Sequence, residues 1–162
     1  MTLGTACYLR SEGKTLFLYR NAGNADIHNA KYVPPGGKTN RGEKGIDCVV
    51  REFKEETGLT LLNPKLRIIA TFYNQGRIMG GKENPEDWQV EVYEASEYSG
   101  ILMPEHQKNA EPLWVQDSDL SRIPMHEGDR KLMELLKEEG VYEALFQYEI
   151  EKLIRFEHVR VG

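Results

Sequence analysis

The sequence predicts an α/β fold in which two helices sandwich a central mixed β-sheet, as one domain over residues 1–162. Two observations predict this class. Short β-prone runs recur along the chain, and two segments with helical periodicity interrupt them, which favours layers of helix packed on sheet. The length, with 40% apolar and 29% charged residues, suits one globular domain with a single core.

The first elements are expected to form a β-hairpin. Residues 5–9 and 15–19 are β-prone and flank the turn sequence of residues 11–14. Residues 21–31 are rich in Asn, Ala and Gly and are predicted to be a loop. Residues 32–37 are predicted to be extended and to enter a turn, because two adjacent prolines exclude a helix there.

The clearest helix is predicted over residues 43–57. Its apolar residues follow the i, i+3, i+4, i+7 spacing of a buried stripe, formed by Ile46, Val49, Val50 and Phe53. Gly58 follows at the position of a helix C-cap.

The second half of the chain continues the alternation. Strands are predicted over residues 66–74, 88–95 and 112–115, with a polar loop over residues 75–87 between the first two. A second helix is predicted over residues 128–139, ended by Gly140, with an apolar face of Leu132, Met133, Leu135 and Leu136. Residues 144–148 and 152–161 are expected to form a closing C-terminal hairpin.

Three carboxylates are neighbours on the first predicted helix. Glu55 and Glu56 follow Glu52 by three and four residues, so all three lie on one part of the helix surface. Like charges at this spacing repel and weaken a helix, whereas a divalent cation removes the conflict. Mg²⁺ takes oxygen ligands, typically carboxylates together with waters and substrate phosphates. The pattern predicts a metal site, and a solvated charged face is the alternative.

The turn at residues 35–38 is expected to approach these carboxylates. Gly45 and Cys48 lie before the carboxylates on the same arc of the helix, and both are small enough to admit another backbone segment. The carbonyls of the turn are suited to a metal, and its N–H groups and Lys38 to phosphate oxygens. Arg51, one turn before Glu55, is expected to hold that carboxylate by a charge-assisted hydrogen bond.

The segment resembles the Nudix box, G-x5-E-x7-R-E-U-x-E-E-x-G-U, in which U is bulky and apolar. Gly37, Glu43 and residues 51–59 match every fixed position of this box over residues 37–59. The probability that an unrelated sequence matches all seven fixed residue types by chance is on the order of 10⁻⁸ per starting point. The resemblance implies a Nudix α/β/α sandwich that hydrolyses nucleoside diphosphate derivatives with Mg²⁺, or with Mn²⁺.

The resemblance also implies roles for individual residues. Glu52 and Glu56 would be the principal metal ligands, and Glu55 a further ligand or part of the base that activates water. Gly36 would offer its carbonyl to the metal. Arg51 would orient a carboxylate, and Glu43 would support the loop and helix.

Beyond the box, the chain loosely resembles MutT-type 8-oxo-dGTP diphosphatases, through Trp114, Ile123-Pro124 and residues 129–161. This implies an oxidised purine nucleoside triphosphate as substrate, with monophosphate and pyrophosphate as products. The residues expected to contact that substrate come from several parts of the chain: Arg20, Tyr32, Val33, Gly37, Lys38, His126 and Asp129.

Three residues depart from the oxidised-purine pattern, and Val33 with Pro34-Pro35 motivates an alternative substrate, such as an ADP-sugar, a dinucleotide or a pyrimidine triphosphate. Val33 stands where the subgroup often has a base-reading Asn, His126 where it has a stacking Trp, and Asn109 where it has a distal Glu. A nucleotide-sensing module without catalysis is a third interpretation. The presence of all three metal carboxylates disfavours it.

Composition and short sequence patterns indicate which partners, which location and which cysteine state to expect. A net charge of −5 lacks the basic footprint of a protein that binds a nucleic acid polymer. No apolar run suits a signal peptide or a membrane span, so a cytoplasmic protein without a membrane partner is expected. Cys7 and Cys48 are not in a CxxC pattern and are expected to be reduced thiols. Either a monomer or a homodimer is compatible with the sequence.

Overall fold

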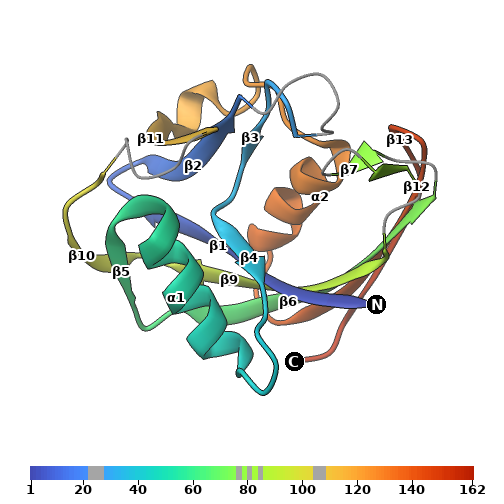
Figure 1. The fold of residues 1–162 in the computed structure, drawn as a ribbon, viewed down its shortest axis with the longest axis horizontal. Helices are drawn as coiled ribbons and strands as arrows, with labels where there is room; N and C mark the ends of the chain where they lie inside the picture. Colours follow the sequence, from blue (N-terminus) through green and yellow to red (C-terminus); the bar gives the residue numbers. More distant parts are fainter. Residues whose placement is uncertain (22–27, 76–77, 80–81, 84–85, 104–108) are drawn as a thin grey trace.

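The structure, a computed structural model, describes residues 1–162 except residues 22–27, 76–77, 80–81, 84–85 and 104–108 (Figure 1). Its centre is a mixed, nine-stranded sheet with the strand order β11-β2-β1-β9-β6-β12-β13, in which β3 pairs with β2 and β4 with β1. The β1–β9 and β6–β12 pairs are parallel, and the other pairs are antiparallel. The predicted α/β architecture with a mixed sheet is therefore confirmed.

The strands of this sheet are β1 Thr2–Ser11, β2 Lys14–Arg20, β3 Tyr32–Val33, β4 Gly36–Lys38, β6 Lys65–Gln75, β9 Trp88–Ala95, β11 Ala110–Gln116, β12 Tyr142–Glu149 and β13 Lys152–Arg160. Two smaller pairs lie outside it: β5 Leu59–Leu62 with β10 Glu97–Gly100, and β7 Ile78–Met79 with β8 Lys82–Glu83. The helices are α1 Gly45–Thr57, α2 Glu127–Leu136 and the short 3₁₀ helix η1 Asp117–Asp119.

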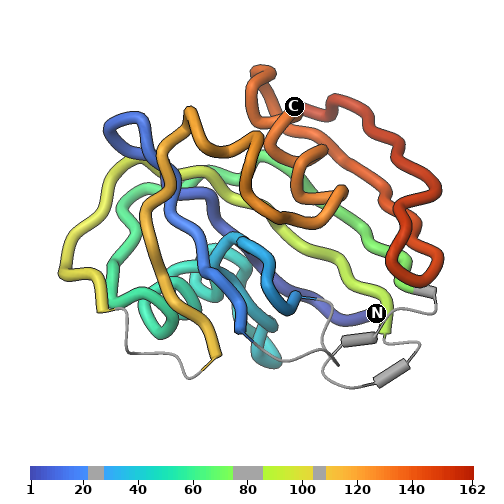
Figure 2. The backbone as a smooth tube through the Cα atoms, turned by 90° about the horizontal axis from the view of Figure 1, so that it is seen from above, coloured from blue at the N-terminus to red at the C-terminus, as the bar shows by residue number. Residues whose placement is uncertain are grey.

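Alternating side chains of the central strands enter two buried clusters, one on each face of the sheet. On one face Cys7 and Leu9 join a cluster with Val49 and Phe53 of α1. On the other face Tyr8, between them in sequence, joins the cluster that contains the buried leucines of α2. Figure 2 shows the strands running between α1 and α2. The two helices therefore cover opposite faces, as in the predicted sandwich.

Helix α1 differs from the expected helix in its start and in its buried face. It begins at Gly45 rather than at residue 43, because Glu43 closes a turn in which its N–H donates to the Asn40 carbonyl. Ile46 is 39% exposed, whereas Cys48 is fully buried, so the buried face is rotated from the predicted stripe. Gly58 adopts the left-handed conformation at φ 82° and caps the helix as predicted.

The second half agrees with the predicted order of elements. The predicted strands correspond to β6, β9 and β11, and the C-terminal hairpin is β12–β13. Helix α2 ends at Leu136, three residues before the predicted end, because the N–H groups of Lys137 and Glu138 bond three residues back in a tighter turn. Strands β5 and β10 were not predicted, and neither were β7 and β8, which pair within the segment expected to be a loop. Residues 22–27 of the first predicted loop, and much of the loop over residues 75–87, lie outside the described residues.

Both cysteines are free and buried, as expected of reduced thiols. Within the described residues, no helix is both long and apolar enough to cross a membrane.

Candidate active site

Two glycines bring β4 against the body of the protein. Gly36 lies opposite Ala6 on β1, where an added Cβ would stand 2.0 Å from the carbonyl oxygen of Thr5. At Gly37 an added Cβ would stand 2.5 Å from the carboxylate of Glu52. The absence of side chains at both positions therefore lets the backbone of the turn lie directly beside a box carboxylate.

The contacts of the small helix residues differ partly from the expected ones. Cys48 lies beside the turn as predicted, with its sulfur 3.8 Å from the Gly37 carbonyl oxygen. Gly45 instead makes room for β9, because an added Cβ would overlap the carboxylate of Glu91. Of these two residues, Cys48 accommodates the turn and Gly45 accommodates a side chain of β9.

Arg51 forms hydrogen bonds to three of the glutamates of the box. Its Nε and Nη2 donate to Glu43 at 2.8 and 2.9 Å, and its Nη1 donates to Glu52 at 2.8 Å. The predicted contact with Glu55 is present but longer, at 3.3 to 3.4 Å. Nη2 also donates to the Lys38 carbonyl, so one guanidinium connects the turn, the start of the box and the helix. These bonds hold the pKa of Glu43 at about 2, below its ordinary 4.5.

Glu56 is the buried carboxylate of the box, with 8% of its surface exposed. It accepts a hydrogen bond from the Gly36 N–H at 2.7 Å. Burial raises the pKa of Glu56 to about 8, and the charges of Glu52 and Glu55 add to this rise. The Gly36 N–H and the charge of Arg20 oppose it. A carboxyl group in this position holds a proton at neutral pH unless a cation takes its place.

The donor set of the box suits a hard divalent cation. Glu52, Glu55, Glu56 and the carbonyl of Gly36 would supply only oxygen ligands, and the carboxylates of Glu52 and Glu56 lie against the glycine turn. Among the residues that the structure describes, no group of three or more acidic, histidine or cysteine side chains lies close enough together to hold a metal ion. Two of these carboxylates, Glu52 and Glu55, accept hydrogen bonds from Arg51.

A cavity of about 350 Å³ opens beside the box. Its lining includes Gly36, Gly37 and Glu56 of the turn and box, together with His126 and Asp129 at the start of α2. Its sides are mostly apolar, with Leu18, Val33, Pro34, Phe72, Trp88, Val90, Val92 and Leu132. An apolar cleft with a few convergent polar groups is typical of a small-molecule site.

The predicted substrate residues divide into two groups. Those that line the cavity are Arg20, Val33, Gly37, His126 and Asp129. Tyr32 and Lys38 are not among the lining residues. The Tyr32 ring packs against Phe17 and Tyr19 with centroids 6.4 and 5.0 Å away, and Lys38 is exposed. Arg20 has a buried Nε with no hydrogen-bond partner among the described residues, which suits an anionic ligand.

Several lining residues were not among the predicted site residues. His28 Nδ1 lies 2.8 Å from His126 Nε2, so the two imidazoles form a pair at the cavity wall. Trp88 is half-buried and lines the cavity together with Asn74 and Tyr148. The period-two alternation of β9 places Trp88 on the same face as Val90 and Val92, which is the signal that could have found it.

Comparisons with known proteins identify the family of this chain. The NUDIX domain family matches residues 2–136. A Nudix hydrolase of Bacillus subtilis, YvcI, itself described as uncharacterized, is 30% identical over 145 residues, which are 89% of this chain and 85% of that protein. The 8-oxo-dGTP diphosphatase of Escherichia coli is 42% identical over 52 residues, 32% of this chain and 40% of that protein.

The fold is also similar to solved structures. The MutT protein of Bacillus halodurans has a TM-score of 0.81 at 24% identity, over 98% of this chain and 97% of that one. The family match covers most of the chain, and it contains the box and every cavity-lining residue except Tyr148. The chain therefore belongs to the Nudix hydrolase family of pyrophosphohydrolases, with the fold of the MutT-type structures.

Proposed function

We propose that this chain hydrolyses a nucleoside triphosphate to the monophosphate and pyrophosphate, and that an oxidised purine such as 8-oxo-dGTP is the preferred base. The observation that supports this most is that one cavity is lined both by Gly37 and Glu56 of the box and by His126 and Asp129 at the start of α2. A phosphate chain at one end and a base at the other would fill such a cleft.

The metal-binding role is part of this proposal. Mg²⁺, held by Glu52, Glu56 and the Gly36 carbonyl, with Glu55 as a further ligand or part of the base, would polarise phosphate oxygens and a water molecule. Arg51 orients Glu52 toward the turn, and Glu56 is held by the Gly36 N–H. Arg20 would place its charge against the phosphate chain.

The base end of the cavity supplies the groups that would select the nucleotide. Asp129 lies in the first turn of α2 and offers acceptors for the edge of a purine, while Trp88 and His126 offer rings against its faces. The relationship to the 8-oxo-dGTP diphosphatase of Escherichia coli also supports an oxidised purine, although it spans only 32% of this chain.

A second substrate class is supported by Val33. Its side chain lines the cavity at the position where base-reading Asn is expected, and it forms no hydrogen bond. A pyrimidine triphosphate, an ADP-sugar or a dinucleotide has less need of a side-chain hydrogen bond from this position.

A nucleotide panel with separate readouts for pyrophosphate and phosphate tests both candidates. With Mg²⁺ present, we expect pyrophosphate release from 8-oxo-dGTP at a much higher kcat/KM than from dGTP, and no release with EDTA. Equal kcat/KM for the two nucleotides, or turnover of another class alone, would overturn the substrate assignment. Glu56→Gln should lower every rate by orders of magnitude, while Asp47→Asn, which removes the same charge from an exposed position on α1, should not.

A further inference from the structure

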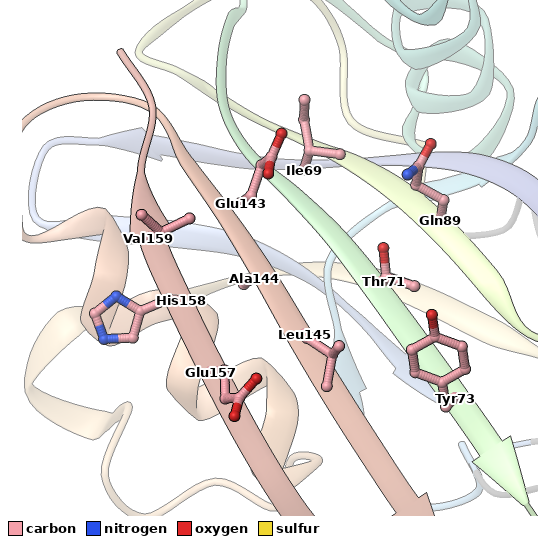
Figure 3. Close-up of a pocket in the computed structure, with 10 residues that line it drawn as sticks. All are labelled: Ile69, Thr71, Tyr73, Gln89, Glu143, Ala144, Leu145, Glu157, His158 and Val159. Atoms are coloured by element: carbon pink, nitrogen blue, oxygen red, sulfur yellow. The ribbon is translucent and has the colours of Figure 1, made fainter.

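Among the described residues that line the cavity beside the box, Tyr148 alone lies beyond the family match, which ends at residue 136. It belongs to β12 of the C-terminal hairpin, whose side chains alternate between the two faces of the sheet. Figure 3 shows Glu143 and Leu145 of β12 lining a hollow of about 630 Å³ on one face. Phe146 and Tyr148 instead join the buried cluster that contains the leucines of α2. The hairpin therefore places Tyr148 both against this cluster and at the cavity.

The Tyr148 hydroxyl is bonded to the first turn of α2. Its oxygen accepts a hydrogen bond from the Gly128 N–H at 2.8 Å, and this contact is buried. The first N–H groups of a helix have no partner within the helix and need one from outside it. The N-cap residue, His126, makes no capping hydrogen bond with its side chain. The hairpin thus supplies a cap that the N-cap side chain does not.

Gly128 brings the start of α2 into direct contact with the sheet. An added Cβ at this residue would lie 2.7 Å from the Tyr148 hydroxyl oxygen, and 3.3 and 3.4 Å from ring carbons of Phe146 and Phe72. These two rings are stacked, with centroids 4.7 Å apart. Glycine weakens a helix relative to alanine, and this close approach explains its presence here. Contact with β6 and β12 therefore sets the position of the first turn.

We propose that Tyr148 is a positioning residue that determines base preference through Asp129. This role rests on the proposed function, in which Asp129 contacts the edge of the nucleobase. Gly128 directly precedes Asp129 in the first turn of α2, so the hydrogen bond fixes the backbone from which that carboxylate extends. Without the hydroxyl, the Gly128 N–H would lose the partner that the structure gives it. An unpaired buried donor is costly, so the first turn would shift and take Asp129 with it.

A second tyrosine of β12 provides a matched control. Tyr142 donates a hydrogen bond from its hydroxyl to the Glu139 carbonyl at 3.1 Å, just after the other end of α2 at Leu136. Tyr142 belongs to the same buried cluster as Tyr148 but does not line the cavity. Tyr142→Phe therefore removes the same group from the same strand, and also breaks one hydrogen bond to the backbone, without touching the base end of the cavity.

Steady-state hydrolysis of a panel of deoxynucleoside triphosphates, with 8-oxo-dGTP included and Mg²⁺ present, tests the proposal. Base discrimination is the ratio of kcat/KM for the best base to kcat/KM for the poorest measurable base. Tyr148→Phe should lower this ratio at least about threefold, the effect of losing one hydrogen bond. The loss should appear as a higher KM for the best base rather than a lower kcat, because the box carboxylates lie on α1. Tyr142→Phe should keep the wild-type ratio.

A double-mutant cycle shows whether Tyr148 acts through Asp129. In an Asp129→Ala background, Tyr148→Phe should cause no further change in base discrimination, because the group that it positions is gone. Hydrogen exchange of the Gly128 amide gives a readout that does not depend on turnover. Exchange should be faster in Tyr148→Phe and unchanged in Tyr142→Phe, with circular dichroism used to verify that both variants are folded.

The outcomes separate this role from the proposed function. Equal base discrimination in the two tyrosine variants would overturn the role of Tyr148 while leaving triphosphate hydrolysis intact. A full additional effect of Tyr148→Phe in the Asp129→Ala background would overturn it as well, because the hydroxyl would then act without Asp129. A wild type that releases no pyrophosphate from any triphosphate would instead overturn the proposed function, and this role with it.

Discussion

Arg51 and Glu43 are joined by two parallel hydrogen bonds, from Nε to Oε2 at 2.8 Å and from Nη2 to Oε1 at 2.9 Å. The remaining nitrogen, Nη1, donates to Glu52 at 2.8 Å. Glu43 lies before the first residue of α1, so its carboxylate fixes the guanidinium from outside the helix. Glu43 therefore orients Glu52 through Arg51, and this chain of contacts explains why both residues belong to one motif.

Replacing Arg51 by Lys should lower kcat about tenfold to a hundredfold. Lysine keeps the positive charge but has a single point of contact, and it cannot hold Glu43 and Glu52 at the same time. The measurement is steady-state hydrolysis of the best nucleotide of the panel, at saturating Mg²⁺. Arg122→Lys is the control, because Arg122 is an exposed arginine paired with Asp119 far from the box. Equal kcat for both variants would show that the paired geometry is unimportant.

Acid should remove a part of the stability that depends on Glu43. The pKa of Glu43 is lowered from 4.5 to about 2, mainly by the hydrogen bonds from Arg51. A carboxylate with a lowered pKa in the folded state stabilises above its unfolded pKa, and this stabilisation is lost as pH falls through the folded pKa. The loss should therefore occur between about pH 4.5 and pH 2.

The measurement is the melting temperature by circular dichroism across that range. Glu43→Gln should melt below the wild type at pH 6, and the gap should close as pH approaches 2. Glu134→Gln, a neutralised exposed carboxylate on α2, serves for comparison. A gap that stays constant with pH would mean that the carboxylate charge is not the stabilising feature.

Metal binding should release a proton from Glu56. Burial raises the pKa of Glu56 from 4.5 to about 8, so the group is mostly protonated at pH 7. In the metal-free protein, a raised carboxyl pKa favours folding below the unfolded pKa of 4.5, and this contribution is lost as pH rises through about 8. A cation requires the ionised form, so apparent Mg²⁺ affinity should rise with pH and level off above 8.

Calorimetry in buffers of different ionisation enthalpy measures this release directly. At pH 7 the wild type should release close to one proton per Mg²⁺ bound at this site, and at pH 9 almost none. In Glu56→Gln the release at pH 7 should disappear together with most of the affinity. Proton release that is equal at pH 7 and pH 9 would refute the assignment to Glu56.

The box was readable from the sequence because its contacts are local. Glu52, Glu55 and Glu56 are neighbours at helical spacing, and Gly58 ends the helix at the position where a left-handed residue is needed. The start of α1 was misplaced because Glu43 continues the helical pattern while its hydrogen bonds close a turn.

The cavity was only partly readable because its walls come from strands that are distant in sequence. Trp88 on β9, Asn74 on β6 and Tyr148 on β12 meet through the strand order of the sheet, which periodicity alone does not specify. The pair of His28 and His126 likewise depends on how two loops meet. The exposure of Ile46 has the same origin, because the stripe is correct in period while the sheet beneath it determines which part is covered.

Alanine at the two glycines of the turn should separate folding from metal binding. At Gly36 the new Cβ would lie 2.0 Å from the Thr5 carbonyl oxygen and 2.7 Å from the Ala6 Cα, both backbone atoms that cannot turn aside. Gly36→Ala should therefore destabilise the fold by about 3 kcal/mol or more, visible as a lower melting temperature. At Gly37 the three atoms nearest to the new Cβ all belong to the carboxylate end of the Glu52 side chain.

Gly37→Ala should accordingly keep a melting temperature near that of the wild type, because a side chain can rotate away. The displaced Glu52 would leave its place beside the turn, so Mg²⁺ affinity should fall at least about tenfold. Thermal melts and Mg²⁺ titrations give the melting temperature and the Mg²⁺ affinity of each of the two variants. A large loss of stability in Gly37→Ala, or wild-type Mg²⁺ affinity in that variant, would mean that Glu52 does not act from the position it holds beside Gly37.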